Sequence, residues 1–296
     1  MFPHLYYSSP RNLPDPLNLQ GQTVVLDLAF CSENLNPSYA KMTGPFIDEL
    51  GGRLALWVDH HDHPYHQYFK GDPRFFLAGK QQYPACTTMI TPQLVQKAGP
   101  VDTIVCHGDL DGLYCAAKWI NGGEEIYQGF DKDAEIIDAR TGKAGKIACT
   151  IDNALRAEYR NLDLKNRIIQ FLVTYPETKK SFLWKAIKSS AAAFLPLAQK
   201  SKELSRFFQI KKQIAYLKIE AGTRFDKTTL LLEGQKITPV AIIEFSGNIT
   251  IAVSFDSNIN LLDILDIGGG MPTRVTLPAS RKEMVFKRLQ TALGSK

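Results

Sequence analysis

Three short apolar segments of this chain each lead into acidic or histidine side chains. The segments are 23–27, 53–58 and 102–106, and a glycine or a proline lies just before each of them. Short apolar runs bounded by turn-forming residues are typical of buried strands. We therefore expect three strands whose polar ends lie close together.

The segments between these strands have the spacing of helices. Apolar residues recur at helical intervals over 38–50 and 87–98, both of which stop at glycine, and a further helix is expected over 112–121. Strand-helix-strand units imply a parallel sheet, and open α/β sheets bind ligands at the carboxyl ends of their strands. The pattern predicts an α/β fold with its site at that edge.

The C-terminal half has a different pattern. Residues 151–172 and 181–217 have helical character, the second interrupted near Pro196, and strands are expected over 229–232, 239–245 and 249–255. The last two would form a hairpin at Ser246-Gly-Asn248. We predict a parallel-sheet catalytic domain over 1–178, a helical connector over 179–215 and a smaller α/β domain over 216–296.

Composition excludes several classes of protein. The chain has 296 residues, of which 44% are hydrophobic, enough to bury two cores, but no apolar run reaches the roughly 18 residues of a membrane span. The N-terminal segment lacks the pattern of a secretory signal, so we expect a cytoplasmic protein. Five scattered cysteines without a CxxC pair argue against disulfides and structural zinc. A net charge of +5 is too small to identify a polyanionic partner.

Histidine is concentrated at two of the strand ends. Five of the six histidines lie in the segment 60–66 or at position 107. Asp59-His60-His61 directly follows a strand, and imidazole with carboxylate suits Mn²⁺, Zn²⁺ or Fe²⁺. Neighbouring side chains at a strand end point to opposite sides, so they can have different roles. A histidine-rich surface loop is the alternative.

The other strand ends carry carboxylates. Asp109 and Asp111 are two residues apart, so both can face one cation, while simple capping of the following helix is the alternative. Asp27 follows the apolar residues of its strand, where a carboxylate is costly unless it is paired or bound to a metal. A hydrogen bond from a loop would also satisfy Asp27.

Together these segments resemble the DHH phosphoesterases, a family that includes RecJ-type exonucleases, nanoRNases and family II pyrophosphatases. Asp59-His60-His61 resembles the motif that names the family, and the segment 107–112 resembles its Asp-x-Asp motif. Asp27 resembles the strand-end aspartate that bridges the metals, and the segment 83–88 the helix start that follows the DHH motif. The segment 266–272 resembles the glycine-rich signature of the DHH-associated domain.

Two features depart from the family pattern. The motifs occur in a different chain order, with Asp27 and His60 before Asp109, which suggests a circular permutation of the catalytic domain. Met271 stands where the glycine motif of the family usually continues with histidine. The second departure weakens the inference that the usual substrates are held in the usual way.

The resemblance implies two Mn²⁺ ions, with Mg²⁺, Co²⁺ or Zn²⁺ as alternatives. Asp27 would contact both ions, with His107 and Asp109 on one of them. The other ion would be held by three further residues: His60, Asp111 and Asp152. A helix cap is an equal alternative for Asp152, and three other aspartates compete for its position: Asp131, Asp133 and Asp138.

The resemblance also implies roles for residues that do not bind metal. His61 would stabilise or protonate the leaving oxygen, and Asp59 would orient a histidine. The phosphate of the substrate would be held by four residues: Gly268, Gly269, Gly270 and Arg274. A tight glycine turn beside a surface arginine is the alternative.

The implied reaction is hydrolysis of phosphodiester or phosphomonoester bonds in short oligonucleotides or small nucleotides. A pyrophosphatase or exopolyphosphatase would use the same metal site and is one alternative. A catalytically inactive nucleotide-binding relic is the other. The sequence leaves the oligomeric state open, a homodimer included.

Overall fold

The computed structural model describes residues 2–177 and 181–294. The chain divides into two compact units. The first comprises Met1–Ala192 with Gly268–Gly270, and the second comprises Ala193–Ile267 with Met271–Lys296. The domain boundary expected between 178 and 179 lies outside the described residues.

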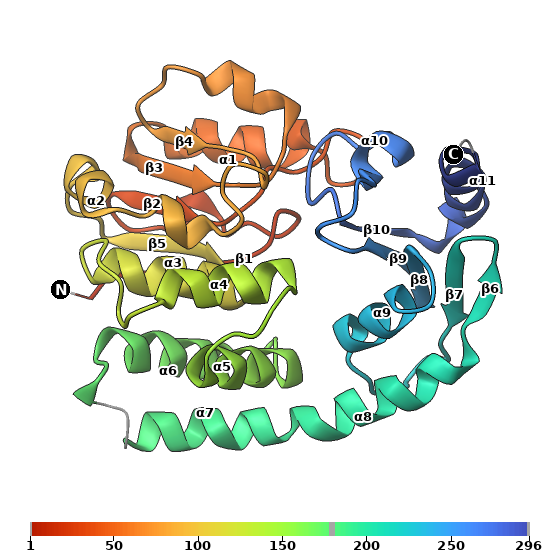
Figure 1. Cartoon of the computed structure of the whole chain (residues 1–296). Helices are drawn as coiled ribbons and strands as arrows, with labels where there is room; N and C mark the ends of the chain where they lie inside the picture. Colours follow the sequence, from red (N-terminus) through yellow and green to blue (C-terminus); the bar gives the residue numbers. More distant parts are fainter. Residues whose placement is uncertain (1, 178–180, 295–296) are drawn as a thin grey trace. The chain divides into compact units, whose positions relative to one another are not determined.

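A five-stranded parallel sheet forms the core of the first unit (Figure 1). Its strands are β1 (His4–Ser8), β2 (Thr23–Leu26), β3 (Leu54–Asp59), β4 (Phe75–Leu77) and β5 (Thr103–His107). Their order in space is β1-β5-β2-β3-β4. The chain runs outward from β2 to β4 and then returns to the other side of β2. The direction of winding therefore switches between β2 and β5, the kind of point at which open α/β sheets bind ligands.

Helices cover both faces of this sheet. Leu26, Val58 and Cys106 face a core that includes buried residues of five helices among the described residues. These are α3 (Leu110–Ile120), α4 (Phe130–Ala139), α5 (Lys146–Ala157), α6 (Leu162–Val173) and α7 (Phe182–Ala192). Val25, Trp57 and Val105 face the opposite core, which includes α1 (Thr43–Leu50). Successive strand residues point to opposite faces, so burial on both sides explains why the strands are apolar throughout.

Two of the helices expected from the sequence are divided. The segment 87–98 contains a 3₁₀ turn, Cys86–Met89, and then α2 (Pro92–Ala98), because Pro92 starts a new helix that Thr91 caps. The segment 151–172 contains parts of two helices: the end of α5, and all of α6 except its last residue, Val173. Asn161 separates them because its side chain accepts a hydrogen bond from the Leu164 N–H at 3.0 Å.

The second unit contains a mixed five-stranded sheet. Its order is β10-β9-β8-β7-β6, and the β7–β8 pair is parallel while the other pairs are antiparallel. The strands are β6 (Gln209–Lys211), β7 (Ile214–Lys218), β8 (Val240–Phe245), β9 (Asn248–Val253) and β10 (Arg274–Pro278). Ser246 and Gly247 have φ values of 48° and 75°, so the predicted hairpin between β8 and β9 forms through a turn with two left-handed residues.

The sequence was wrong about two elements near this sheet. The segment 229–232 is not a strand but part of α9 (Lys227–Gln235), which Asp226 caps by accepting from the Thr229 N–H at 2.6 Å. The expected long helix over 181–217 consists of α7 (Phe182–Ala192), α8 (Phe194–Leu204) and the first strands of the sheet. The unit also contains α10 (Leu261–Leu265) and α11 (Lys282–Gly294).

Among residues 2–177 and 181–294, none of the helices has the length and apolar character needed to cross a membrane.

Candidate metal centre

The register of the first sheet brings three strand ends to the same height. Leu26 on β2 pairs with Cys106 on β5 and with Val58 on β3. The next position along each strand is therefore Asp27 in the middle, with His107 on one side and Asp59 on the other. The three polar strand ends therefore lie side by side, as expected from the sequence.

Asp27 lies at the centre of this arrangement in an uncommon backbone conformation. Its φ of 53° is in the left-handed region, which Asp tolerates better than most residues, and its N–H donates to the Val58 carbonyl oxygen at 2.9 Å. The side chain is buried, and Oδ1 has no hydrogen-bond partner among the described residues. Burial, and then the Asp109 charge, raise the pKa of Asp27 well above its usual value. A cation would relieve both penalties.

His60 is held so that one ring nitrogen faces three carboxylates. Its Nδ1 lies 2.8 Å from the Tyr83 carbonyl oxygen, which can only accept, so Nδ1 carries the proton. Nε2 lies 3.2 Å from Asp27 Oδ1, 3.5 Å from Asp111 Oδ2 and 3.8 Å from Asp138 Oδ2. It has no hydrogen-bond partner in the part of the chain that is described. A lone pair that faces carboxylate oxygens is the arrangement of a metal ligand.

Asp111 is fixed by backbone groups of the segment that follows the DHH-like motif. Its two oxygens accept hydrogen bonds from the N–H groups of Cys86 at 2.7 Å and Thr87 at 3.2 Å. Burial raises the pKa of Asp111 well above its usual value, and the Asp27 charge raises it further. The segment 83–88 therefore orients two candidate ligands, His60 and Asp111.

His107 and Asp109 form the other side of the cluster. His107 Nδ1 lies 2.9 Å from Asp109 Oδ2 and 4.0 Å from Asp27 Oδ2. Asp109 Oδ1 also accepts from the Gly112 N–H at 3.2 Å, so this side chain caps α3 with one oxygen and faces the cluster with the other. Burial lowers the pKa of His107, but the Asp109 charge outweighs burial and raises it to about 9. Gly112 is needed because a Cβ there would lie 2.3 Å from the His107 carbonyl oxygen.

Three overlapping groups of side chains in the described residues could hold a cation. In each group one ligand atom per residue lies within 4.8 Å of the others. The groups are Asp27 with His60 and His61, Asp27 with His107 and Asp109, and His60 with Asp111 and Asp138. Carboxylate and imidazole suit Mn²⁺ and related divalent ions, so the donor set fits the metals that the sequence resemblance implies.

The structure does not bring Asp152 to this cluster. Its carboxylate receives two hydrogen bonds from Arg140, at 2.7 and 3.1 Å, and one from Arg156 at 3.1 Å. None of the three groups includes it. Asp138, one of the alternatives, takes its place beside His60. Asp138 lies inside α4, where no strand end marks it, and the sequence offered it only as an alternative to Asp152.

The two remaining alternatives have other partners. Asp131 is ion-paired with Lys118 at 2.6 Å. Asp133 accepts hydrogen bonds from the Tyr127 hydroxyl at 2.9 Å and from the Gly145 N–H at 2.5 Å. These bonds explain both side chains without a metal.

Asp59 orients His61 from a fully buried position. Its Oδ1 lies 2.8 Å from His61 Nδ1, and its Oδ2 accepts from the His61 N–H at 3.3 Å. Burial raises the pKa of Asp59, but attraction to His61 and its hydrogen bond outweigh burial, so the pKa is lowered. With Nδ1 engaged, the other ring nitrogen of His61 is the one left to act on a ligand.

No protein-family model matches the sequence, and no curated protein matches it. PggH from Vibrio cholerae, a pGpG-specific phosphodiesterase, is similar in structure, with 14% identity and a TM-score of 0.47 over 81% of this chain and 79% of that chain. An exonuclease RecJ bound to manganese has 14% identity and a TM-score of 0.47 over 91% and 74%.

RecJ of Thermus thermophilus, in complex with Mg²⁺, has 15% identity and a TM-score of 0.40. The match covers 62% of this chain and 30% of that RecJ. The chain has an α/β fold with one parallel and one mixed five-stranded sheet.

The residues of the three ligand groups form what we call the DHH-like cluster: Asp27, His60, His61, His107, Asp109, Asp111 and Asp138. Sequence reasoning missed one residue in contact with this cluster, Lys80. This lysine is 3% exposed, and its ammonium group is ion-paired with Asp138 Oδ2. Burial lowers the pKa of Lys80, but the nearby carboxylates, Asp138 first, raise it above its usual value. Lys80 lies in the loop between β4 and the 3₁₀ turn at Cys86, and no local pattern marks it.

The glycine segment Gly268–Gly270 contacts the loop that follows the DHH-like motif. The Gly270 N–H donates to the Asp62 carbonyl oxygen at 2.8 Å, so it is not free for a phosphate. Gly269 has a φ of 106°, and a Cβ there would lie 2.0 Å from His63 Cδ2. The glycines therefore allow a close approach to this loop. Arg274, which belongs to the second unit, donates to the Thr228 hydroxyl at 3.1 Å.

His63 has a structural role in the same loop. Its Nε2 donates to the Cys31 carbonyl oxygen at 3.0 Å, and its Nδ1 accepts from the Tyr65 N–H at 3.1 Å. Burial lowers the pKa of His63 to about 4. Both nitrogens are engaged by backbone groups, so this histidine is explained without a ligand.

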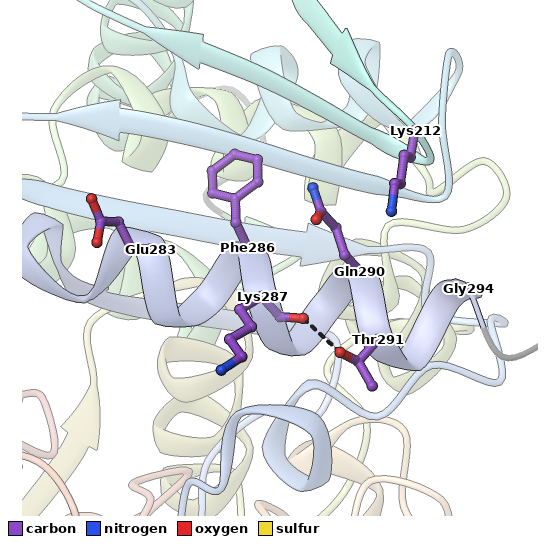
Figure 2. Close-up of a pocket in the computed structure, with 7 residues that line it drawn as sticks. All are labelled: Lys212, Glu283, Phe286, Lys287, Gln290, Thr291 and Gly294. Atoms are coloured by element: carbon purple, nitrogen blue, oxygen red, sulfur yellow. Dashed lines mark hydrogen bonds between the residues drawn. The ribbon is translucent and has the colours of Figure 1, made fainter.

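A groove of about 700 Å³ lies along α11 in the second unit, and Figure 2 shows side chains that line it. Its lining includes Lys212, Glu283, Phe286 and Lys287. The lining contains one carboxylate and no histidine, so the groove lacks the donor set of the DHH-like cluster.

Proposed function

We propose that the chain is a metal-dependent phosphoesterase that hydrolyses phosphodiester bonds in short oligonucleotides or small nucleotides. The observation that carries the proposal is the position of Asp27. Its buried carboxylate lies between the two sides of the cluster, with Oδ1 3.2 Å from His60 Nε2 and Oδ2 4.0 Å from His107 Nδ1, and Oδ1 has no hydrogen-bond partner among the described residues. A shared carboxylate is what a pair of neighbouring cations requires.

Each side of Asp27 would supply ligands to one cation position. His107 and Asp109 form the position beside β5, whereas His60, Asp111 and Asp138 form the position beside β3 and α4. Divalent ions, Mn²⁺ first, would neutralise the phosphate and activate water there. In this proposal Asp138 replaces Asp152, whose two arginine partners already neutralise it.

His61 would act on the leaving oxygen. Its Nδ1 is held by Asp59, and its side chain is 15% exposed, so Nε2 can reach a bound substrate. A positioned imidazole of this kind donates a proton to the departing oxygen. Asp59 is the positioning residue because it touches His61 and not the substrate.

The reordered motifs fit the same proposal. Asp27 and Asp59 precede His107 in the chain, yet β2, β3 and β5 are neighbours in the sheet. A circular permutation of a DHH domain would keep these strand ends together while changing the order in which the chain reaches them. Gly268 and Gly269 would contact the phosphate, whereas the Gly270 N–H is already engaged.

The test is a hydrolysis assay with the full chain and Mn²⁺. The substrates are the linear dinucleotide pGpG, RNA and DNA oligomers of a few nucleotides, and pyrophosphate. Asp27→Asn keeps the backbone conformation and removes the charge, while Asp163→Asn makes the same change at an exposed ion pair on α6.

We expect release of nucleoside monophosphate by the native chain and by Asp163→Asn, and loss of at least about 100-fold in Asp27→Asn. Cleavage of pyrophosphate in place of the oligomers would replace the proposal with a phosphoanhydride hydrolase. Absence of all hydrolysis with Mn²⁺ bound would favour the inactive relic.

A further inference from the structure

The DHH-like cluster already contains a cation that belongs to the chain. The ammonium group of Lys80 is ion-paired with Asp138 Oδ2, the oxygen that lies 3.8 Å from His60 Nε2. Asp138 and His60 are two members of the ligand group beside β3. The same carboxylate would therefore have to serve both the lysine and a metal ion.

The two cation positions differ in this respect. Across residues 2–177 and 181–294, the ion pairs of Asp27 and Asp109 are formed with histidine side chains. A histidine can lose its proton and then bind the ion itself, so these pairs can give way to metal bonds while the side chain stays in place. Lysine offers no lone pair while it is charged, so at Asp138 it can only compete.

The surroundings of Lys80 favour retention of its ammonium group. The side chain is 3% exposed, and a buried ammonium is costly unless carboxylates surround it. Asp138 contacts it directly, and Asp138 lies in the same ligand group as His60 and Asp111. Its flexible four-carbon stem would let the charge move aside when an ion enters.

We propose that Lys80 acts as an internal cation at the position formed by His60, Asp111 and Asp138. The chain would then bind one divalent ion tightly, at Asp27, His107 and Asp109. A second ion would bind more weakly because it must displace the Lys80 ammonium from Asp138. Lys80 is thus a positioning residue that sets the metal occupancy. This inference rests on the proposed function because it takes the cluster to be a metal centre.

The test measures Mn²⁺ binding and not catalysis. The full chain is freed of metal and titrated with Mn²⁺ by isothermal calorimetry, and the bound metal is counted after dialysis. We expect one tight and one weaker site in the native protein. Lys80→Met keeps the length of the side chain and removes the charge, so it should tighten the second site by at least about tenfold.

Two further variants serve as controls. Lys80→Arg keeps the charge and should leave the second site weak. Lys118→Met removes a different buried lysine, which is paired with Asp131 at 2.6 Å, and should leave both sites as in the native protein. If Lys118→Met tightened the second site as much as Lys80→Met, general loss of buried charge would explain the effect and the proposal would fall.

A second measurement on the native protein covers the case in which Lys80→Met does not fold. An acid anhydride modifies exposed amines, and peptide mass spectrometry reports the modification of Lys80. We expect Lys80 to be protected without metal and with one equivalent of Mn²⁺, and to react when Mn²⁺ is saturating. Protection that does not change with Mn²⁺ would overturn the proposal.

The outcomes separate this inference from the proposed function. Two tight sites in the native protein, unchanged in Lys80→Met, would overturn the role of Lys80 and leave the metal centre intact. No binding of Mn²⁺ by the native chain would overturn both.

Discussion

At the scale of single residues, the two ring nitrogens of His61 have different surroundings. Its Nδ1 is held 2.8 Å from Asp59, which leaves Nε2 as the nitrogen that can move a proton. We expect His61→Ala to lower kcat for a dinucleotide about 10²- to 10⁴-fold. The loss should be much smaller for bis-p-nitrophenyl phosphate, because p-nitrophenolate leaves without a proton. Steady-state kinetics with both substrates provide the measurement.

The control for this comparison is His4→Ala, which changes an exposed histidine at the start of β1. It should leave kcat for both substrates unchanged. An equal loss of kcat for the two substrates in His61→Ala would show that His61 acts in some way other than protonation of the leaving oxygen.

Asp138 and Asp152 provide a second prediction at this scale, since both are helix aspartates that pair with a cation. Asp138→Asn should weaken Mn²⁺ binding by at least about tenfold, because a ligand carboxylate beside His60 is lost. Asp152→Asn should leave Mn²⁺ affinity unchanged and lower the free energy of unfolding by roughly 2 kcal/mol, because it leaves Arg140 and Arg156 without their shared charge.

Calorimetric titration with Mn²⁺ and urea unfolding of both variants check these expectations. The reverse result, with metal affinity lost in Asp152→Asn and retained in Asp138→Asn, would restore the ligand set expected from the sequence.

These residues also show what sequence alone could locate. Asp27, His60 and His107 end strands or directly follow them, so an apolar run points to each. Asp138 lies inside α4 and Lys80 lies in a loop, and only the folding of distant segments brings them together. A local pattern carries no information on such contacts, and for that reason the sequence favours Asp152 over Asp138 as the ligand.

At the scale of elements, the glycine segment gives a prediction about packing. Gly269→Ala should lower the free energy of unfolding by about 3 kcal/mol, because the backbone is left-handed and the new Cβ would lie 2.0 Å from His63 Cδ2. Gly222→Ala is the matched control, with a φ of 83° and nothing within 4 Å of its new Cβ. It should cost about 1 kcal/mol, the backbone part alone.

Chemical denaturation of the two variants measures the difference. Equal destabilisation would show that the loop at His63 can move aside without a loss of free energy. Gly269 would then be needed only for its backbone conformation.

The elements that the sequence predicted are those with the longest apolar runs. β2, β3 and β5 are buried on both faces and stand out as continuous apolar segments. β4 has three residues and β1 begins with an exposed histidine, so neither has a pattern long enough to be distinguished from a loop. The sequence predicts a strand over 229–232 because three consecutive leucines show neither the spacing of a helix nor that of a half-buried strand. The helix becomes recognisable from its N-terminal cap, Asp226, which accepts a hydrogen bond from the Thr229 N–H.

At the scale of the whole molecule, we expect metal binding to raise the stability of the folded chain. The cluster buries Asp27, Asp111 and His60 close together, and an ion that binds only the folded chain stabilises it by mass action. At Mn²⁺ concentrations about 100 times the Kd the gain is about 2.7 kcal/mol. For a unit of this size, that corresponds to a rise in Tm of roughly 5 to 10 °C.

Scanning calorimetry with Mn²⁺, and again after EDTA is added, measures this rise. Asp27→Asn should show little change in Tm with Mn²⁺. A native Tm that does not respond to Mn²⁺ or to EDTA would show that the cluster does not bind the ion in the folded state.

The backbone of Asp27 also limits how this protein can change by mutation. Its φ of 53° suits few residue types. Among the amino acids that one base change in an aspartate codon can introduce, Asn and Gly fit that conformation best, and neither carries a negative charge. Genetic drift at this codon would thus remove the shared carboxylate while preserving the sheet around it. Lineages descended from this chain would lose the candidate metal centre before they lost the fold.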